Sequence, residues 1–119
     1  MILLDTNIFI YLAKGELAAD SIANTDIAHA SITKVEALGF PALPANELLL
    51  LTELFEESYT LDLSAAIVNQ AIRLRQAKPM SLGDAIIAAT ALEHNLELWT
   101  ANTEDFIHIE KLQLVNPMS

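Results

Sequence analysis

Short apolar runs alternate with longer helical patterns along the chain, and this alternation constrains the fold more than any other feature of the sequence. The apolar runs predict strands over residues 2–4, 27–31, 59–63, 96–100 and 112–115. Helical patterns fill the intervals, over residues 8–19, with an interruption at Gly15, and over 33–38, 46–57, 64–77 and 81–94. Strands that alternate with helices favour an α/β fold with a mostly parallel sheet of roughly five strands, covered by helices on both faces.

Length and composition narrow the class of protein further. A chain of 119 residues is expected to form a single domain, residues 1–119, around one hydrophobic core. Hydrophobic residues make up 53% and charged residues 18%, which excludes a disordered chain and indicates surface reserved for a partner. No apolar stretch approaches the ~18 residues of a membrane-spanning helix. Without cysteines or a recognisable secretory signal, we expect a cytoplasmic protein with no membrane partner.

The charge balance excludes one mode of nucleic-acid binding. Sixteen acidic residues against six basic ones give a net charge of −10, which disfavours broad neutralisation of phosphates by the protein itself. Contact with a phosphate through a bound divalent cation stays possible. An acidic surface also suits a protein partner that carries arginine or lysine.

Four acidic residues fall where the predicted elements meet. Asp5 directly follows the first predicted strand, and Glu36 lies five residues beyond the second. Asp84 begins the helix over 81–94, and Asp105 follows the fourth strand. Ligands of parallel sheets bind beyond the carboxyl ends of the strands, so we expect these acids to converge there. Converging carboxylates repel unless they are protonated or bound to a cation, and Mg²⁺ or Mn²⁺ prefers such oxygen ligands.

Each acid also has a purely structural interpretation as part of a turn or a helix cap. Asp5 can be a turn residue or a helix cap, and Thr33 with Glu36 fits a capping box. Ser81 and Asn102 can cap the helices in whose first turns Asp84 and Asp105 lie. Gly83 weakens this interpretation for its neighbour, because glycine is unfavourable inside a helix. Its presence predicts that another group approaches the backbone closely at this point.

Four segments, in order, resemble the acidic motifs of PIN-domain ribonucleases, especially the VapC-type toxins of bacterial toxin–antitoxin pairs. They are MILLDTNI at 1–8, SITKVEAL at 31–38, LGDAIIAATA at 82–91 and WTANTEDF at 99–106. The resemblance covers nearly the whole chain. It implies a PIN-like three-layer α/β/α fold, Mg²⁺- or Mn²⁺-dependent cleavage of RNA, a cognate antitoxin and a homodimer.

The resemblance also implies roles for individual residues. Asp5, Glu36 and Asp84 match the central metal-site acids, and Asp105 is assigned as the fourth. Some relatives carry an Asp where Asn102 stands, so the site here has one full charge fewer. The residues expected to support the acids are Thr6, Asn7, Thr100 and Asn102, and Lys34 is expected to contact the RNA phosphate.

Three functions are compatible with these residues. The leading one is a metal-dependent endoribonuclease toxin, in which the acid-held metal activates water for in-line attack on the RNA phosphate. The alternative is a catalytically weak PIN-like module that binds RNA or protein, which Asn102 favours. An α/β phosphatase ranks last, because Asn7 stands where such enzymes commonly carry a second Asp. The apolar residues of 48–55 exceed one helix stripe and can form a groove for an antitoxin segment.

Overall fold

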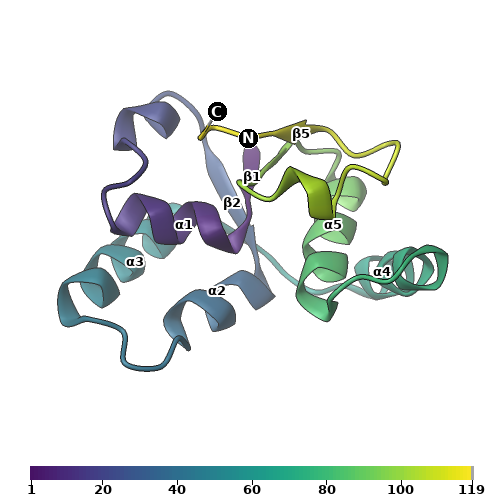
Figure 1. Cartoon of the computed structure of the whole chain (residues 1–119), viewed down its shortest axis with the longest axis horizontal. Helices are drawn as coiled ribbons and strands as arrows, with labels where there is room; N and C mark the ends of the chain where they lie inside the picture. The colour runs from purple at the N-terminus through teal and green to yellow at the C-terminus, as the bar shows by residue number, and fades with distance from the viewer. Residues whose placement is uncertain (119) are drawn as a thin grey trace.

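The computed structural model describes residues 1–118, and a five-stranded parallel sheet forms its centre (Figure 1). The strands are β1 (Ile2–Leu4), β2 (Ile27–Ala30), β3 (Tyr59–Leu61), β4 (Leu98–Trp99) and β5 (Leu114–Val115). Their spatial order is β3-β2-β1-β4-β5, and all four pairings are parallel. The predicted α/β class and strand count are confirmed, and β1 occupies the middle of the sheet.

Helices cover both faces of the sheet and complete three layers (Figure 1). One layer contains α1 (Thr6–Ala13), α2 (Ser31–Leu38) and α3 (Ala45–Glu57), which contact one another. The opposite layer contains α5 (Leu82–His94), with α4 (Ala65–Ala77) packed against its outer side. Two short 3₁₀ helices, Ala19–Ile22 and Thr103–Asp105, lie in the connections.

The core divides at β1, because successive strand residues point to opposite faces of a sheet. Ile2 and Leu4 belong to the cluster shared with α1 and α3, which includes Phe9. Leu3 belongs to the cluster on the α5 face, which includes Ile87. A strand covered on both faces needs an uninterrupted apolar run, which residues 2–4 supply.

The first predicted helix is wrong at its carboxyl end. The helix ends at Ala13 rather than at residue 19, and Lys14 caps it through backbone hydrogen bonds. Gly15 then takes a left-handed conformation with φ of 75°, which glycine adopts without steric cost and which turns the chain away from the helix axis.

The helix predicted over 33–38 begins two residues earlier, at Ser31, and its cap position is Ala30. Thr33 is therefore buried inside the helix, and the capping-box interpretation of Thr33 and Glu36 is wrong. The strands are also shorter than predicted at one or both ends, except β1. Among residues 1–118 no helix is long and apolar enough to span a membrane.

Candidate active site

Asp5 lies at the carboxyl end of β1 and is the most buried of the predicted site acids, with 4% of its surface exposed. Its Oδ1 accepts a hydrogen bond from the backbone N–H of Thr6 at 2.8 Å. Its Oδ2 accepts one from the Thr100 hydroxyl at 2.7 Å and one from the Asn7 amide at 3.3 Å. The carboxylate thus caps α1 and is also fixed by the neighbouring strand.

A second set of hydrogen bonds joins these partners to the loop after β4. The Asn7 Oδ1 accepts from the backbone N–H of Ala101 at 3.2 Å, and the Thr100 Oγ1 accepts from that of Asn102 at 3.0 Å. The Asn102 side chain is exposed and does not cap the 3₁₀ helix that follows, so the predicted cap there is wrong. Asn102 supports the site through its backbone alone.

Glu36 projects from α2 toward the start of α1 and the start of α5. Its Oε1 accepts a hydrogen bond from the Thr6 hydroxyl at 2.7 Å, and that hydroxyl lies 3.2 Å from the hydroxyl of buried Thr33. A Cβ atom added to Gly83 would stand 2.6 Å from the Glu36 Oε2. The group that approaches the backbone at Gly83 is therefore the carboxylate of Glu36.

Asp84 occupies the first turn of α5, where Ser81 caps the helix by accepting from the Asp84 backbone N–H at 3.1 Å. Burial raises the pKa of the Asp84 carboxyl, and the negative charges of Asp105 and Glu36 raise it further, while the bond to Ser81 opposes the shift. Asp105 is exposed on the 3₁₀ helix after β4. Asp105 therefore acts on the site by repelling the carboxylate of Asp84.

The same mutual repulsion acts on Asp5. Burial raises the pKa of its carboxyl to about 6, and the charges of Asp84 and Glu36 add to the increase. The hydrogen bonds from Thr100 and Thr6 oppose it. The structure thus brings the four predicted acids to one edge of the sheet, where their charges interact.

Comparison with known proteins identifies the architecture around these acids. The PIN domain family matches residues 2–112. The chain belongs to the PIN-domain family. A comparison with curated protein sequences gives no significant match.

Solved structures resemble this PIN domain over nearly its full length. A toxin-antitoxin complex from Klebsiella pneumoniae is 31% identical with a TM-score of 0.79, covering 98% of each chain. VapBC-1 from nontypeable Haemophilus influenzae is 26% identical with a TM-score of 0.82, covering 100% of each chain. VapBC2 from Rickettsia felis, bound to a DNA fragment from its promoter, is 25% identical with a TM-score of 0.81 and 98% coverage of each chain. The fold thus resembles VapC toxins of VapBC toxin–antitoxin systems.

The oxygen ligands of this PIN domain suit a hard divalent cation in their chemistry, although not in their spacing in this structure. All four acids offer carboxylate oxygens, and a cation would offset the burial and the mutual repulsion that raise the pKa values of Asp5 and Asp84. Within residues 1–118, no three Asp, Glu or His side chains stand close enough together to hold an ion. The acids therefore repel one another at this edge, but they lie too far apart to coordinate one ion together.

Lys34, the predicted phosphate contact, is exposed on α2. Its charge contributes to the lowered pKa of the buried His29. The described part of the chain gives Lys34 no hydrogen bond or ion pair with any of the four acids. Its contact with a phosphate stays a prediction.

Asp62 is a further carboxylate at this edge that the sequence analysis missed. It follows β3 and accepts a hydrogen bond from the Ser31 hydroxyl, at the first position of α2, at 3.2 Å. The run over 59–63 placed Asp62 inside a predicted strand, whereas β3 ends at Leu61. A charged residue near the end of an apolar run was the available signal that the strand stops there.

His29 is an ionisable residue of β2 and lies in the core. It is fully buried in β2, with its Nδ1 2.7 Å from the Ser58 hydroxyl and its Nε2 3.2 Å from the Thr60 hydroxyl. Burial lowers its pKa to about 4, with a contribution from Lys34 that the charge of Asp62 opposes. His29 is therefore a neutral core residue at neutral pH.

Asp5 and His29 should give opposite pH dependences of folding in EDTA-containing buffer. The pKa of His29 falls from 6.5 to about 4 on folding, so stability is lost as the pH drops through this range. The pKa of Asp5 rises from 3.8 to about 6, so stability is gained as the pH drops from about 6 toward 3.8. Each contribution amounts to about 3 kcal/mol at full extent, and the two largely offset each other.

Two variants separate the contributions in urea unfolding measured between pH 4 and 6.5. Relative to the wild type, Asp5→Asn should lose stability with falling pH, because the opposing gain is removed. His29→Gln should gain stability with falling pH, aided by the raised pKa of Asp84. Asp20→Asn, at an exposed position, is the control and should follow the wild-type profile. Parallel profiles for all four proteins would contradict the assignment.

Proposed function

We propose that this PIN domain is a Mg²⁺- or Mn²⁺-dependent endoribonuclease that acts in the cytoplasm as the toxin of a VapC-type toxin–antitoxin pair. The observation that carries the proposal is the placement of the four acids. They come from four separate segments and interact at one sheet edge, where Thr100, Asn7 and Thr6 fix the Asp5 carboxylate. Secondary structure alone does not require a buried acid beside two others, Asp84 and Glu36, with Asp105 acting in turn on Asp84.

The proposed ligands of the cation are Asp5, Glu36, Asp84 and Asp105. When bound, the cation lowers the pKa of a coordinated water and neutralises the charge that develops on the scissile phosphate. Asp5 contributes orientation, because both of its carboxylate oxygens accept hydrogen bonds. Asp84 has a raised pKa in the metal-free protein, so a bound cation would stabilise its charged form. Lys34 is the proposed contact to the RNA phosphate.

A groove between α1, α2 and α3 is the proposed site for the antitoxin. Its volume is about 280 Å³, and its lining is mostly apolar, including Ile10, Leu43 and Leu51. Phe40 stands at the groove with 62% of its surface exposed. The matched structures include toxin–antitoxin complexes, which supports a partner segment that inserts apolar side chains here.

A second apolar surface is the proposed homodimer interface. We call it the Val35 patch: Val35 and Leu63 are 71% and 52% exposed, and with Ile32 and Ile86 they line an apolar hollow of about 220 Å³. Val35 adjoins Glu36 in sequence. A second copy on this patch would therefore bring two acidic edges close to each other.

The nuclease proposal is tested by incubating the purified protein with a panel of tRNA and rRNA in Mg²⁺, Mn²⁺ or excess EDTA. The wild type should give discrete cuts that EDTA abolishes. Asp5→Asn and Asp84→Asn should each reduce cleavage by more than about 100-fold, because each removes a charged ligand. Asp20→Asn removes an exposed carboxylate remote from the four acids and should cleave normally.

If cleavage is absent in every metal while circular dichroism shows folded protein, the nuclease proposal fails for these RNAs. The catalytically weak PIN-like module then becomes the better explanation, since Asn102 leaves the edge with one charge fewer. Gel-shift binding of the same RNAs would support that alternative.

Gly83→Ala should weaken cleavage without destabilising the fold. The new Cβ would displace the Glu36 carboxylate and break its hydrogen bond with Thr6, which we expect to reduce activity about tenfold. Alanine is favoured over glycine in a helix by up to ~1 kcal/mol, so urea unfolding should show equal or higher stability. Glu36→Asp in the same chain shortens the acid and should restore part of the rate. Full activity of Gly83→Ala would rule out a role for this contact.

Val35→Lys should convert the dimer to a monomer in sedimentation velocity, because it places a charge in the Val35 patch. Leu48→Lys is the matched control: Leu48 is 44% exposed on α3, away from this patch, and its substitution should leave the dimer intact. A Val35→Lys protein that stays dimeric would place the interface elsewhere.

A further inference from the structure

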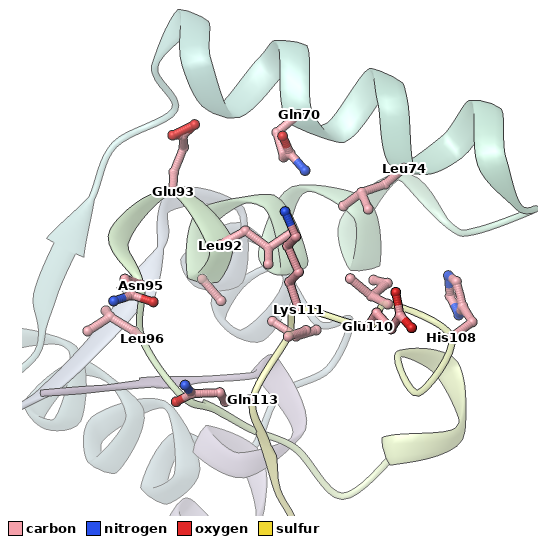
Figure 2. A pocket seen from close by; sticks show the side chains of 13 residues that line it. Gln70, Leu74, Leu92, Glu93, Asn95, Leu96, His108, Glu110, Lys111 and Gln113 are labelled. Carbon is pink, nitrogen blue, oxygen red and sulfur yellow. The ribbon is translucent and has the colours of Figure 1, made fainter.

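The largest of the pockets described lies at the opposite end of α5 from the acids, with a volume of about 590 Å³ (Figure 2). It opens between α4, the last turn of α5 and residues 108–113. From Asp84 to Glu93 the helix advances about 13.5 Å, so the pocket is separate from the acidic edge. Its volume falls within the range of roughly 300–1,000 Å³ typical of small-molecule sites.

Two hydrogen-bond donors point into this pocket. The Gln70 Oε1 accepts from the Arg73 guanidinium at 2.7 Å, which leaves the amide NH₂ of Gln70 to face the pocket. In Figure 2 the Lys111 side chain rises from the loop toward Gln70 and Leu92. Within residues 1–118, the ammonium of Lys111 has no hydrogen bond or ion pair.

His108 adds a polar atom that the protein leaves unsatisfied. Its Nε2 is buried and has no hydrogen-bond partner among the described residues. The ring stands at one end of the pocket, next to Glu110 (Figure 2). A buried nitrogen without a partner costs free energy. Because this nitrogen has no exposed surface, a molecule in the pocket would reach it only after the ring moves.

The rest of the pocket combines an apolar wall with charged groups of both signs. Leu74, Leu92 and Ile109 provide the apolar wall. Lys111 lines the pocket together with two carboxylates, those of Glu93 and Glu110. The carboxylate of Glu93 is directed away from Lys111 in Figure 2.

We propose that this pocket binds a small organic anion. Its carboxylate or phosphate group accepts from Lys111 and Gln70, and an apolar or aromatic body packs on Leu74, Leu92 and Ile109. This site is independent of the proposed nuclease activity, because it shares none of the four acids.

The test is an ¹H–¹⁵N NMR titration of the full chain in EDTA with four matched probes. Phenyl phosphate and phenylacetate each combine an aromatic ring with an anionic group, a phosphate in one and a carboxylate in the other. Inorganic phosphate has the anionic group without a ring, and benzyl alcohol has the ring without a charge. At least one phenyl anion should bind saturably and shift the signals of Gln70, Lys111 and Leu92. The single-part probes should bind about tenfold more weakly or not at all. The stronger of the two anions identifies the preferred acid group.

Variants assign the binding to the pocket. Lys111→Met keeps the aliphatic stem and should weaken binding about tenfold, and Gln70→Leu should weaken it as well. Lys78→Met, at an exposed lysine that follows α4, should bind like the wild type.

Three results would overturn the proposal. They are no saturable binding of either phenyl anion up to roughly 10 mM, unchanged affinity in Lys111→Met, and equal affinity for inorganic phosphate. Failure of the nuclease assay would leave this result unaffected, since the titration contains no metal or RNA.

Discussion

The burial of the Asp5 carboxylate is the constraint on which the rest of the acidic edge depends. A charge removed from water costs several kcal/mol unless polar groups compensate for it. Here the compensation comes from the backbone of α1 and from Thr100, which lies 95 residues away in the sequence. A pKa of about 6 reflects an incomplete balance between burial and these hydrogen bonds. The edge is thus held in a state that a cation or a proton would stabilise.

The hydrogen bonds around Asp5 also determine how its neighbours are arranged. Thr6 donates its backbone N–H to Asp5 and its hydroxyl to Glu36, so one residue orients two acids. Asn7 and Thr100 connect Asp5 to the loop before Asp105. In this arrangement the position of an acid depends on secondary-structure elements other than its own. A substitution in one loop is therefore expected to shift more than one carboxylate.

The sequence predicted the order of strands and helices, the α/β class and the positions of the four acids, because apolar periodicity and strand–helix junctions are local signals. It mispredicted features that depend on tertiary contacts. Thr33 has the spacing of a capping box, yet it is buried in α2 beside Thr6. Gly83 indicated a close approach without naming the group, since the Glu36 carboxylate arrives from another helix. The sequence did not indicate that Asp62 lies beyond the strand, because the end of β3 at Leu61 is set by its pairing with β2.

The strand order β3-β2-β1-β4-β5 has a geometric consequence for ligand access. The chain moves outward from β1 to β2 and β3 with α1, α2 and α3 on one face. It then returns to β4 by way of α4 and α5 on the other face. The loops after β1 and β4 therefore diverge into opposite layers, and this point is the topological switch at which ligands of parallel sheets bind. Asp5 and Thr100 lie side by side at this point. Because Glu36 and Asp105 are exposed whereas Asp5 is buried, a molecule that approaches this edge meets their carboxylates before that of Asp5.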